Sequence, residues 1–473
     1  MGQSLPLVVD LDGTLIKSDL LFESFYVLLK HNPLFVFIIP FWLLRGKAYL
    51  KYQIAARVEV DVTLLPYNKK FLEFLHGEFH KGRELILATG SSNALAQRVA
   101  EHLGIFSGVL ASDKNVNMSA KRKLKIFLAS YGAKGFDYAG NAWVDLNIFP
   151  HSRHALLVNP GWVISKKAEK ITDVKKVFEN KSNRFALYLR TIRAYQWLKN
   201  LLLFVPLFTA HEWHNIPMVI KGITGFIAFS LCASGGYLFN DLLDLPSDRN
   251  HPQKRNRPLA SGDISIVSGS ILMIVLLLTG LSIAVFIEWN FFGILIVYLA
   301  LTLAYSIFLK TYMLIDVLIL AGLYTFRVIA GGEVMNVTLS FWLIAFSIFI
   351  FYSLALVKRC SELFTMDKIG SESTKGRDYR VTDLEYLKVM GIASGYLSVI
   401  VVALYVNSPD VARLYSRPKV LWVLCPLLLH WISRLWLKTG RGEMTDDPIV
   451  FALRDRVSQL IAFTVAGIIF WAI

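Results

Sequence analysis

The sequence predicts an N-terminal α/β domain over residues 1–183, followed by an all-α integral membrane domain over residues 184–473. The length of 473 residues fits two or three domains. Short apolar runs that end in polar residues recur in the first part, whereas long apolar runs recur in the second. Charged residues make up only 18 % of the chain, against about 25 % in soluble proteins, and hydrophobic residues make up 55 %. This composition excludes a disordered chain, a collagen, a coiled coil and a disulfide scaffold.

The formal net charge of +15 is divided almost evenly between the two parts. A nucleic acid is one partner that such a charge attracts, but no nucleic-acid-binding motif occurs. Cytoplasmic loops of membrane proteins are rich in Lys and Arg, which accounts for the charge without such a partner. We therefore expect the lipid bilayer and phosphorylated substrates as partners, and no nucleic acid.

The three cysteines, Cys232, Cys360 and Cys425, are scattered and form no Cys-x-x-Cys pair. We expect neither disulfides nor a zinc site from them. Residues 1–9 contain no basic segment followed by a long apolar one. We therefore expect no signal peptide and a cytoplasmic N-terminal domain.

Four short apolar runs predict strands of a parallel sheet in the first part. Helical patterns separate these runs, and polar residues follow them. Because sheets of this kind form their sites at the carboxyl ends of the strands, we expect a Rossmann-like fold with its site at that edge. The predicted strands are Leu5–Val9, Leu85–Ala88, Phe136–Ala139 and Ala155–Val158.

Residues 33–44 are almost wholly apolar and include three phenylalanines and a tryptophan. The segment is too short to cross a bilayer easily. It is either a buried helix or a helix that rests on the membrane surface, and both interpretations stay open here.

Long apolar runs in the second part predict about nine transmembrane helices. Basic residues gather in the loops that lie inside when the N-terminus is cytoplasmic, and few stand in the outer loops. The expected spans are residues 186–210, 217–241, 264–287, 291–309, 314–333, 339–357, 388–406, 418–437 and 456–473.

A first acidic motif, Asp10-Leu-Asp12-Gly-Thr14, follows the first predicted strand. Two carboxylates spaced in this way beyond a strand converge on one cation. One carboxylate can attack a phosphorus atom while the other protonates the leaving oxygen. A Mg²⁺ ion screens the repulsion between an anionic nucleophile and an anionic substrate. The motif therefore predicts phosphoryl chemistry with one Mg²⁺ ion.

This motif resembles the first motif of the haloacid dehalogenase superfamily of phosphatases, and the resemblance extends over the N-terminal part. It implies Asp10 as the nucleophile and Asp12 as the general acid and base. Thr89 matches the hydroxyl that holds the phosphoryl group. Lys121 matches the lysine of the third motif, and Lys123 is its rival.

The fourth motif of that superfamily resembles Gly140-Asn-Ala-Trp-Val-Asp145. The family usually has Gly-Asp where this chain has Gly140-Asn141, so one ligand carries less charge. The resemblance also implies a small helical cap over about residues 16–83. The metal ligands that it implies are Asp10, Asp12, Asn141 and Asp145.

A second acidic motif, Asn240-Asp241-Leu-Leu-Asp244-Leu-Pro-Ser-Asp248, ends a predicted span. Carboxylates spaced three and four residues apart lie on one face of a helix end. Like charges near a bilayer repel one another, so they need a partner. One or more Mg²⁺ ions that hold a diphosphate supply that partner.

This second motif resembles the Asn-Asp-x-x-Asp-x-x-x-Asp motif of the UbiA superfamily of intramembrane prenyltransferases, which has nine spans. The family normally has a second aspartate-rich loop, which does not occur between Lys358 and Val381. Basic residues stand there instead, Lys375 among them. A basic loop suits a highly phosphorylated donor better than a second clamp for a prenyl diphosphate.

Further stretches resemble one branch of that superfamily, the polyprenyl-phosphate phosphoribosyltransferases. By resemblance, this branch joins phosphoribosyl pyrophosphate to a polyprenyl phosphate and releases pyrophosphate, with Asp241, Asp244 and Asp248 as catalytic residues and metal ligands. The stretches are Arg193–Asn200, Asp248–Leu259, Tyr305–Lys310, Arg327–Gly332 and Asp446–Pro448. The substrate-binding residues implied are Arg193, Lys199, Asn240, Lys254, Arg255, Arg257, Tyr305, Lys310, Arg327, Lys358 and Arg377.

Arg327 stands within a predicted span, where an ionisable residue serves either function or a structural pair. We expect Lys199, Lys254, Arg255 and Arg257 to neutralise the 5-phosphate or the lipid phosphate. One Mg²⁺ ion is expected at this site, and more are left open.

The product of such a transfer carries a 5-phosphate, which a phosphatase of the first kind removes to give polyprenyl-phosphoryl-ribose, a precursor of lipid-linked arabinose. We therefore expect a bifunctional enzyme of the bacterial inner (plasma) membrane with both active sites cytoplasmic. In one alternative, the membrane domain moves a prenyl group from a diphosphate to an aromatic acceptor. In another, the N-terminal domain is a non-catalytic docking module. A transport pump is disfavoured because pumps carry Asp-Lys-Thr-Gly-Thr in an inserted domain. Homo-oligomerisation is left open.

Overall fold

Two compact units make up the protein, and each combines two stretches of chain. The computed structural model describes residues 5–179, 183–368, 370, 377–444 and 447–473. The first unit combines Met1–Ile192 with Tyr237–Met273, and the second combines Arg193–Gly236 with Ile274–Ile473. The segment with the second acidic motif therefore packs with the N-terminal residues.

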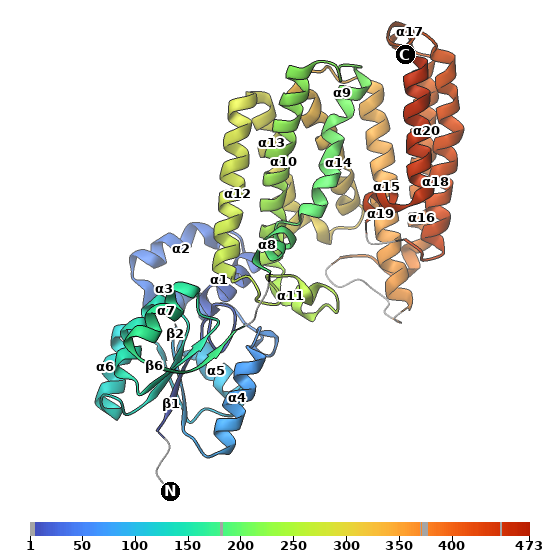
Figure 1. The fold of residues 1–473 in the computed structure, drawn as a ribbon. Helices are drawn as coiled ribbons and strands as arrows, with labels where there is room; N and C mark the ends of the chain where they lie inside the picture. Colours follow the sequence, from blue (N-terminus) through green and yellow to red (C-terminus); the bar gives the residue numbers. More distant parts are fainter. Residues whose placement is uncertain (1–4, 180–182, 369, 371–376, 445–446) are drawn as a thin grey trace. The chain divides into compact units, whose positions relative to one another are not determined.

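A parallel sheet forms the centre of the first unit, and its six strands within the described chain follow the order β3-β2-β1-β4-β5-β6 (Figure 1). The predicted parallel α/β fold is thus confirmed. The sequence did not predict β3 and β6, because these edge strands are partly exposed and lack the long buried runs of central strands. The strands are β1 (Leu7–Asp10), β2 (Leu85–Ser92), β3 (Gly108–Ser112), β4 (Asp137–Gly140), β5 (His154–Val158) and β6 (Asp173–Phe178).

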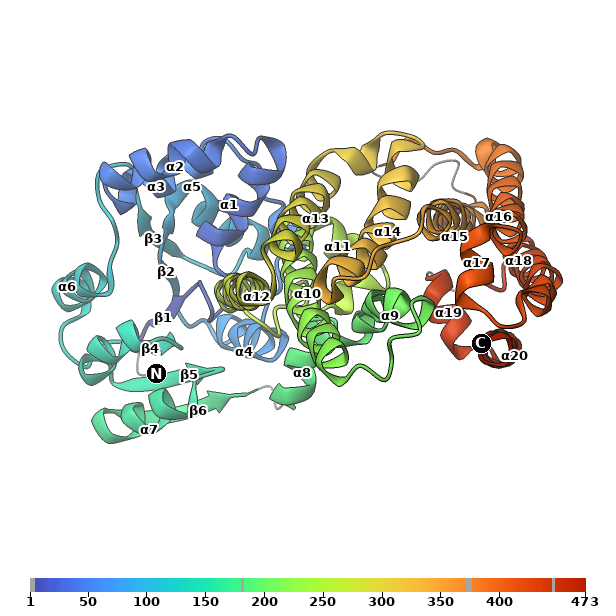
Figure 2. The same ribbon diagram turned by 90° about the horizontal axis from the view of Figure 1, so that it is seen from above.

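Helices cover both faces of this sheet (Figures 1 and 2). Successive side chains of a strand point to opposite faces. Leu7 and Val9 of β1 therefore share one buried cluster with Phe71 of α4 and residues of α5. Val8 joins the cluster on the other face, with Phe127 of α6 and residues of α7. These helices are α4 (Lys69–His80), α5 (Asn93–Leu103), α6 (Ala120–Tyr131) and α7 (Trp162–Ile171).

Three helices between β1 and α4 form a cap. Asp19 caps the first of them by accepting two backbone N–H groups of its first turn. The second covers most of residues 33–44, and Trp42 is its buried residue, whereas Phe37 is 70 % exposed and Phe41 67 % exposed. The interpretation of this segment as a buried helix is therefore wrong. The helices are α1 (Leu20–His31), α2 (Phe35–Leu44) and α3 (Lys47–Ala55).

The second stretch of the first unit packs against helix α1. Two nitrogens of Arg249 donate to the carboxylate of Glu23 at 3.1 and 2.6 Å, and both side chains are buried. The hydroxyls of Tyr26 and Ser270 share a hydrogen bond of 2.7 Å. The stretch holds the end of α10 (Ile216–Leu243), α11 (Leu245–Asn250) and the first turns of α12 (Ile266–Ile287).

Seven helices in the described ranges are long and apolar enough to cross a membrane, so this is a multi-pass membrane protein. Besides α10 and α12, they lie within the second unit, where α13, α14, α15, α16 and α18 pack in chain order (Figure 1). Their bounds are α13 (Trp289–Ile307), α14 (Ile315–Met335), α15 (Phe341–Lys368), α16 (Leu384–Val406) and α18 (Leu424–Gly440).

The predicted count of nine spans is not confirmed. Arg193 at a φ of +53° separates two helices within the predicted span 186–210, and Pro206 stands in the first turn of a third. The predicted span 456–473 is a helix of 17 residues, shorter than the roughly 20 residues of a usual span. The pieces are α8 (Arg184–Thr191), the 3₁₀-helix Ala194–Phe204, α9 (Val205–Thr209) and α20 (Arg456–Ala472), and the other short helices are α17 (Pro409–Leu414) and α19 (Pro448–Arg454).

Candidate active sites

The first candidate site lies where β1 and β2 end. Asp12 Oδ2 accepts hydrogen bonds from Thr89 Oγ1 at 2.9 Å and from Ser91 Oγ at 2.7 Å. Its Oδ1 accepts the backbone N–H of Leu20, the first residue of α1, at 2.9 Å. The predicted Asp12 and Thr89 thus come together. Ser91 was missed, although it stands in the same Thr-Gly-Ser run that directed attention to Thr89.

Lys123, and not Lys121, reaches the expected nucleophile. Its Nζ donates to Asp10 Oδ1 at 2.6 Å and to the carbonyl oxygen of Ala88 at 2.9 Å, and the side chain is buried. Helix α6 turns one face to the sheet, and Lys123 lies on that face with Phe127, four residues on. Lys121 is exposed. Of the two lysines that the sequence left open, the contacts therefore favour Lys123 as the partner of Asp10.

Asp10 is buried among charged groups. Burial raises the pKa of Asp10 to about 7, although Lys123 lowers it, and the charges of Asp145 and Asp12 raise it further. A carboxyl group attacks phosphorus in its ionised form. A further cation at Asp10 would therefore favour the reactive form.

Asn141 lies beside Asp10. Thr14 Oγ1 is 3.5 Å from Asp10 Oδ2 and 3.4 Å from Asn141 Oδ1, so both oxygens border one small region. Mg²⁺ takes oxygen ligands and keeps several waters in protein sites, so these two oxygens fit it. Asp145 instead accepts two backbone N–H groups at 2.9 and 2.8 Å and the Tyr138 hydroxyl at 2.9 Å. Its carboxylate thus fixes the loop that carries Asn141.

Lys51 of the cap is a candidate that no sequence pattern indicated. Its Nζ donates to the carbonyl oxygen of Gly90 at 2.5 Å and to Asn117 Oδ1 at 3.3 Å. Gly90 is the middle residue of the Thr-Gly-Ser loop that holds Asp12. Burial lowers the pKa of Lys51, while the charge of Asp12 raises it. The sequence held no indication of Lys51 because it belongs to α3, far along the chain from the residues at the strand ends.

The second candidate site is the acidic motif at the end of α10. Arg257 NH1 lies 3.0 Å from Asp241 Oδ1 and 2.6 Å from Asp248 Oδ2, so one nitrogen bridges two carboxylates. Lys30 of α1 lies 2.7 Å from Asp244 Oδ1. Helix α10 ends before Asp244 and α11 begins after it, so the three carboxylates surround a helix break rather than lying on one helical face.

Asp241 and Asp248 fit a cation. Their oxygens lie within 3.0 Å of one nitrogen, which marks a point where a positive charge is held. Burial raises the pKa of Asp248, while Arg257 lowers it and Asp241 raises it. Across the described residues, no group of three or more acidic, histidine or cysteine side chains is arranged as a metal site. Magnesium at either candidate site would therefore depend on few protein oxygens together with water.

In the second unit, the predicted Tyr305 and Arg377 gather around Arg359 of α15. Arg359 NH2 donates to the Tyr305 hydroxyl at 3.0 Å, and its NH1 and Arg377 NH1 each lie 2.6 Å from Glu362 Oε2. Arg359 Nε is 2.5 Å from Asp316 Oδ2. Arg359 and Asp316 were not selected as site residues. Asp316 could have been noticed because an acidic residue in the first turn of a predicted span is unusual.

Arg327 connects several helices of the second unit. Its Nε donates to Asn200 Oδ1 at 2.9 Å, its NH1 to the carbonyl oxygen of Leu323 at 2.5 Å and its NH2 to the Tyr298 hydroxyl at 3.0 Å. The guanidinium also stacks on the rings of Tyr298 and Phe229. These contacts support the structural role that was left open for this residue.

The other predicted substrate-binding residues are spread over several elements. Lys199 forms an ion pair with Asp447. Lys375 of the basic loop and Asp446 of the stretch Asp446–Pro448, which carried the resemblance, lie outside the described residues. The rest are Arg193 before the 3₁₀-helix Ala194–Phe204, Asn240 on α10, Lys254 and Arg255 on the exposed 3₁₀-helix Lys254–Asn256, Lys310 on the 3₁₀-helix Leu309–Thr311, and Lys358 on α15.

The protein thus combines a parallel α/β sheet with a multi-pass helical part, and an acidic motif stands at the end of one long apolar helix. Residues 201–451, more than half of the chain, match the UbiA prenyltransferase family. The chain belongs to this family.

Curated relatives cover either the whole chain or part of it. An uncharacterized protein of Sinorhizobium fredii, y4nM, is 37 % identical over 468 residues, which is 98 % of this chain and 90 % of that protein. The nodulation protein NoeC of Azorhizobium caulinodans is 32 % identical over 60 % of this chain and 93 % of its own. Decaprenyl-phosphate phosphoribosyltransferase of Mycobacterium tuberculosis is 31 % identical over 59 % of this chain and 92 % of its own.

Proposed function

We propose that this protein transfers 5-phosphoribose from phosphoribosyl pyrophosphate to a polyprenyl phosphate and then removes the 5-phosphate. The observation that carries this proposal is that both acidic motifs belong to one compact unit. Transfer yields a phosphomonoester, and hydrolysis of a phosphomonoester is the chemistry that Asp10 and Asp12 suit. We place both reactions on the cytoplasmic side of a bacterial inner membrane.

For the transfer step, the proposal is supported by the family and by relatives named for this reaction. It is also supported by Asp241 and Asp248, which hold one positively charged nitrogen of Arg257 between them. The bond from ribose C1 to pyrophosphate breaks, and the electron pair leaves with pyrophosphate. An oxygen of the lipid phosphate then bonds to C1. Magnesium, when bound, supplies charge neutralisation at both sites. Asp241, Asp244 and Asp248 would hold that ion.

For the hydrolytic step, the proposal is supported by the contacts of Asp10 and Asp12. Asp10 attacks the phosphorus of the 5-phosphate, and the bond from phosphorus to the sugar oxygen breaks as Asp12 gives that oxygen a proton. Water, with Asp12 as base, then hydrolyses the phospho-aspartyl group and releases phosphate. Thr89 and Ser91 orient Asp12 for both proton transfers, and Lys123 neutralises negative charge at Asp10.

Labelled phosphoribosyl pyrophosphate tests the transfer. Purified full-length protein receives the donor, Mg²⁺ and a polyprenyl phosphate, and label is followed into the organic phase. We expect the wild type to incorporate label into the lipid, and Asp241→Asn to lose this activity. Asp378→Asn, at an exposed position, is the control and should incorporate label like the wild type. Wild-type protein without incorporation would refute the transfer.

The mass of the labelled lipid tests the second step. We expect dephosphorylated product from the wild type and the 5-phosphorylated lipid from Asp10→Asn, with Asp113→Asn as the exposed control. An Asp10→Asn sample that contains only dephosphorylated lipid would exclude the N-terminal site as its phosphatase.

The family description favours a second candidate, transfer of a prenyl group from a prenyl diphosphate to an aromatic acceptor. The same enzyme preparation, given a prenyl diphosphate and an aromatic acid, distinguishes the two. Prenylated aromatic product without ribosylated lipid would replace the first candidate by the second.

A further inference from the structure

Helix α2 of the cap exposes apolar side chains over the broad face that lies away from its buried residue Trp42. Phe37, Phe41 and Leu44 are 70, 67 and 84 % exposed. Charged residues do not occur within the ten residues of this helix. An apolar patch of this size on a folded unit marks a contact surface, because water is an unfavourable environment for it.

The cap is joined to the start of a candidate membrane span. Helix α1, which precedes α2 by three residues, contacts the first turns of α12 through the Tyr26–Ser270 hydrogen bond. Helix α12 continues as one of the seven apolar helices that suit a membrane. Helix α1 therefore contacts α12, a helix that suits the bilayer, so a bilayer is always near the cap. A protein partner for α2 would have to be an additional molecule.

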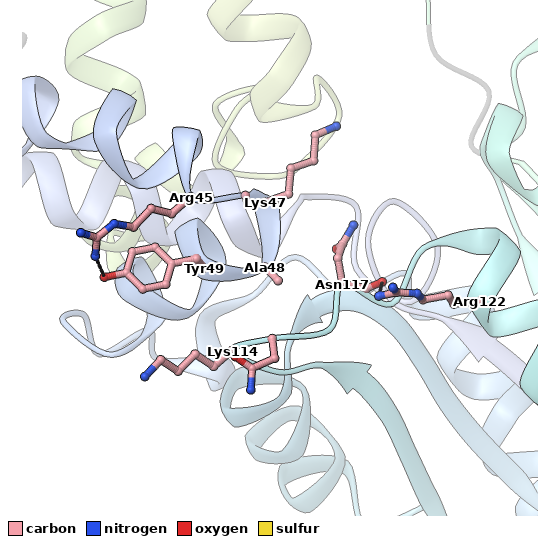
Figure 3. A pocket seen from close by; sticks show the side chains of 9 residues that line it. Arg45, Lys47, Ala48, Tyr49, Lys114, Asn117 and Arg122 are labelled. Atoms are coloured by element: carbon pink, nitrogen blue, oxygen red, sulfur yellow. Dashed lines mark hydrogen bonds between the residues drawn. The ribbon is translucent and has the colours of Figure 1, made fainter.

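A basic pocket lies at the C-terminal end of α2. Its volume is about 530 Å³, and it is lined by residues of the α2–α3 turn, the loop after β3 and helix α6 (Figure 3). Four of the nine described lining residues are cationic and none is acidic. Arg45 comes from the turn, Lys47 is the first residue of α3, Lys114 comes from the loop and Arg122 from α6. Such a pocket attracts an anion, and arginines suit a phosphate in particular.

Direct contacts connect this pocket to the phosphatase motifs. Asn117, which lines the pocket, accepts a hydrogen bond from Lys51 Nζ at 3.3 Å, and its carbonyl oxygen accepts one from Arg122 at 3.2 Å. The same Lys51 Nζ donates to Gly90, between the two hydroxyl residues that hold Asp12. A substrate with two phosphates can therefore place one in the pocket and the other at the strand ends.

We propose that α2 lies in the bilayer interface and that the basic pocket binds the linkage phosphate of a lipid-linked sugar phosphate, whose terminal phosphate is then hydrolysed. This inference rests on the proposed phosphatase function and names its substrate class as a membrane lipid with a phosphodiester. Apolar side chains in the interface and cations at the phosphate level are the arrangement that interfacial helices use.

Fluorescence quenching tests the position of α2. Phe41→Cys and the control Phe79→Cys, on α4 and 43 % exposed, are labelled in full-length Cys425→Ser protein in nanodiscs. Lipids that carry a nitroxide on the acyl chain quench a fluorophore in the bilayer. We expect loss of fluorescence at position 41 and none at position 79. Equal fluorescence at both positions, with and without the nitroxide, would overturn the bilayer contact.

Kinetics in the same nanodiscs test the pocket. We expect Arg45→Gln/Arg122→Gln to raise KM for lipid-linked 5-phosphoribose about tenfold, as loss of charge-assisted contacts to one phosphate predicts. The rise for soluble ribose 5-phosphate should be smaller, and the exposed control Lys69→Gln/Lys70→Gln should change neither KM. Equal rises for both substrates would overturn the assignment of the linkage phosphate.

Two further outcomes distinguish a wrong ligand for the pocket from a wrong phosphatase function. An effect that appears only when the discs contain phosphatidylglycerol would assign the pocket to bulk lipid headgroups and overturn its assignment to substrate. Wild-type protein that hydrolyses neither substrate would refute the phosphatase function and the pocket's ligand together, while the quenching result alone would then decide the position of α2.

Discussion

The two acidic sites of the first unit hold their carboxylates in different ways. At the strand ends, Asp12 accepts two hydroxyls and a backbone N–H, all neutral donors. At the end of α10, Asp241 and Asp248 share the charged Arg257, whose side chain is partly exposed. Neutral donors leave the charge of a carboxylate in place, whereas an arginine cancels it. Asp12 is therefore oriented in advance for a ligand, whereas Asp10 is paired with Lys123. At the second site, Arg257 is a cation that a ligand or metal has to displace.

Asp10→Asn breaks the first site most strongly. We expect phosphatase activity to fall by about 10³-fold or more, because the nucleophile is lost, with transfer unchanged. Phosphate release and label incorporation measure the two activities in one preparation. A variant that retains phosphate release would remove Asp10 from the reaction.

The same variant has an effect on stability. The pKa of Asp10 is raised in the folded protein from 3.8 to about 7, so its contribution to stability is complete below about pH 4 and is lost as the pH rises through 7. Asn does not titrate. In metal-free buffer we therefore expect the variant to gain up to about 4 kcal/mol over the wild type at pH 8 relative to pH 4, measured by unfolding. A pH-independent difference would contradict the raised pKa.

Lys123→Met, compared with Lys121→Met, sharpens the picture of the first site. Lys123 lowers the pKa of Asp10, so its removal raises that pKa and moves the acid limb of the pH–rate profile upward. We expect a loss of about 10²-fold near neutral pH, and almost none for Lys121→Met. Equal pH–rate profiles for the two variants would contradict the role of Lys123 at Asp10.

Arg257→Gln tests whether Mg²⁺ can take the place of the arginine between Asp241 and Asp248. Without Arg257 the carboxylates of Asp241 and Asp248 repel each other, and we expect a loss of stability of about 1–2 kcal/mol because the arginine is partly exposed. Added Mg²⁺ should raise the Tm of this variant more than that of the wild type or of the exposed control Arg255→Gln. Identical Mg²⁺ shifts in all three proteins would speak against a metal between Asp241 and Asp248.

Lys30→Gln has the smallest expected effect. The ion pair between Lys30 and Asp244 is well exposed, so its removal should cost about 0.5 kcal/mol or less. Transfer should change by about twofold at low salt, and the difference should vanish at high salt because ions screen the pair. A larger, salt-independent loss would indicate that this lysine contacts the substrate.

Sequence patterns predicted the central strands and the residues that follow them, because burial and spacing are local properties. The choice between Lys121 and Lys123 depended on how α6 is rotated against the sheet, which the spacing alone does not define. The composition of residues 33–44 fitted either a buried helix or a helix on the membrane surface, because both kinds of helix are rich in apolar residues. Glu23 and Lys30 were not identified, because their partners Arg249 and Asp244 are more than two hundred positions away.

The buried pair between Glu23 and Arg249 bears on how this gene can be divided. Arg249 lies beside the second acidic motif, yet its counter-ion Glu23 stands on helix α1 of the cap. A fragment that begins after residue 183 would lose this counter-ion together with helix α1 that packs on it, so the guanidinium would have to turn to water. A split version of the protein would therefore need both polypeptides together to keep the Glu23–Arg249 pair.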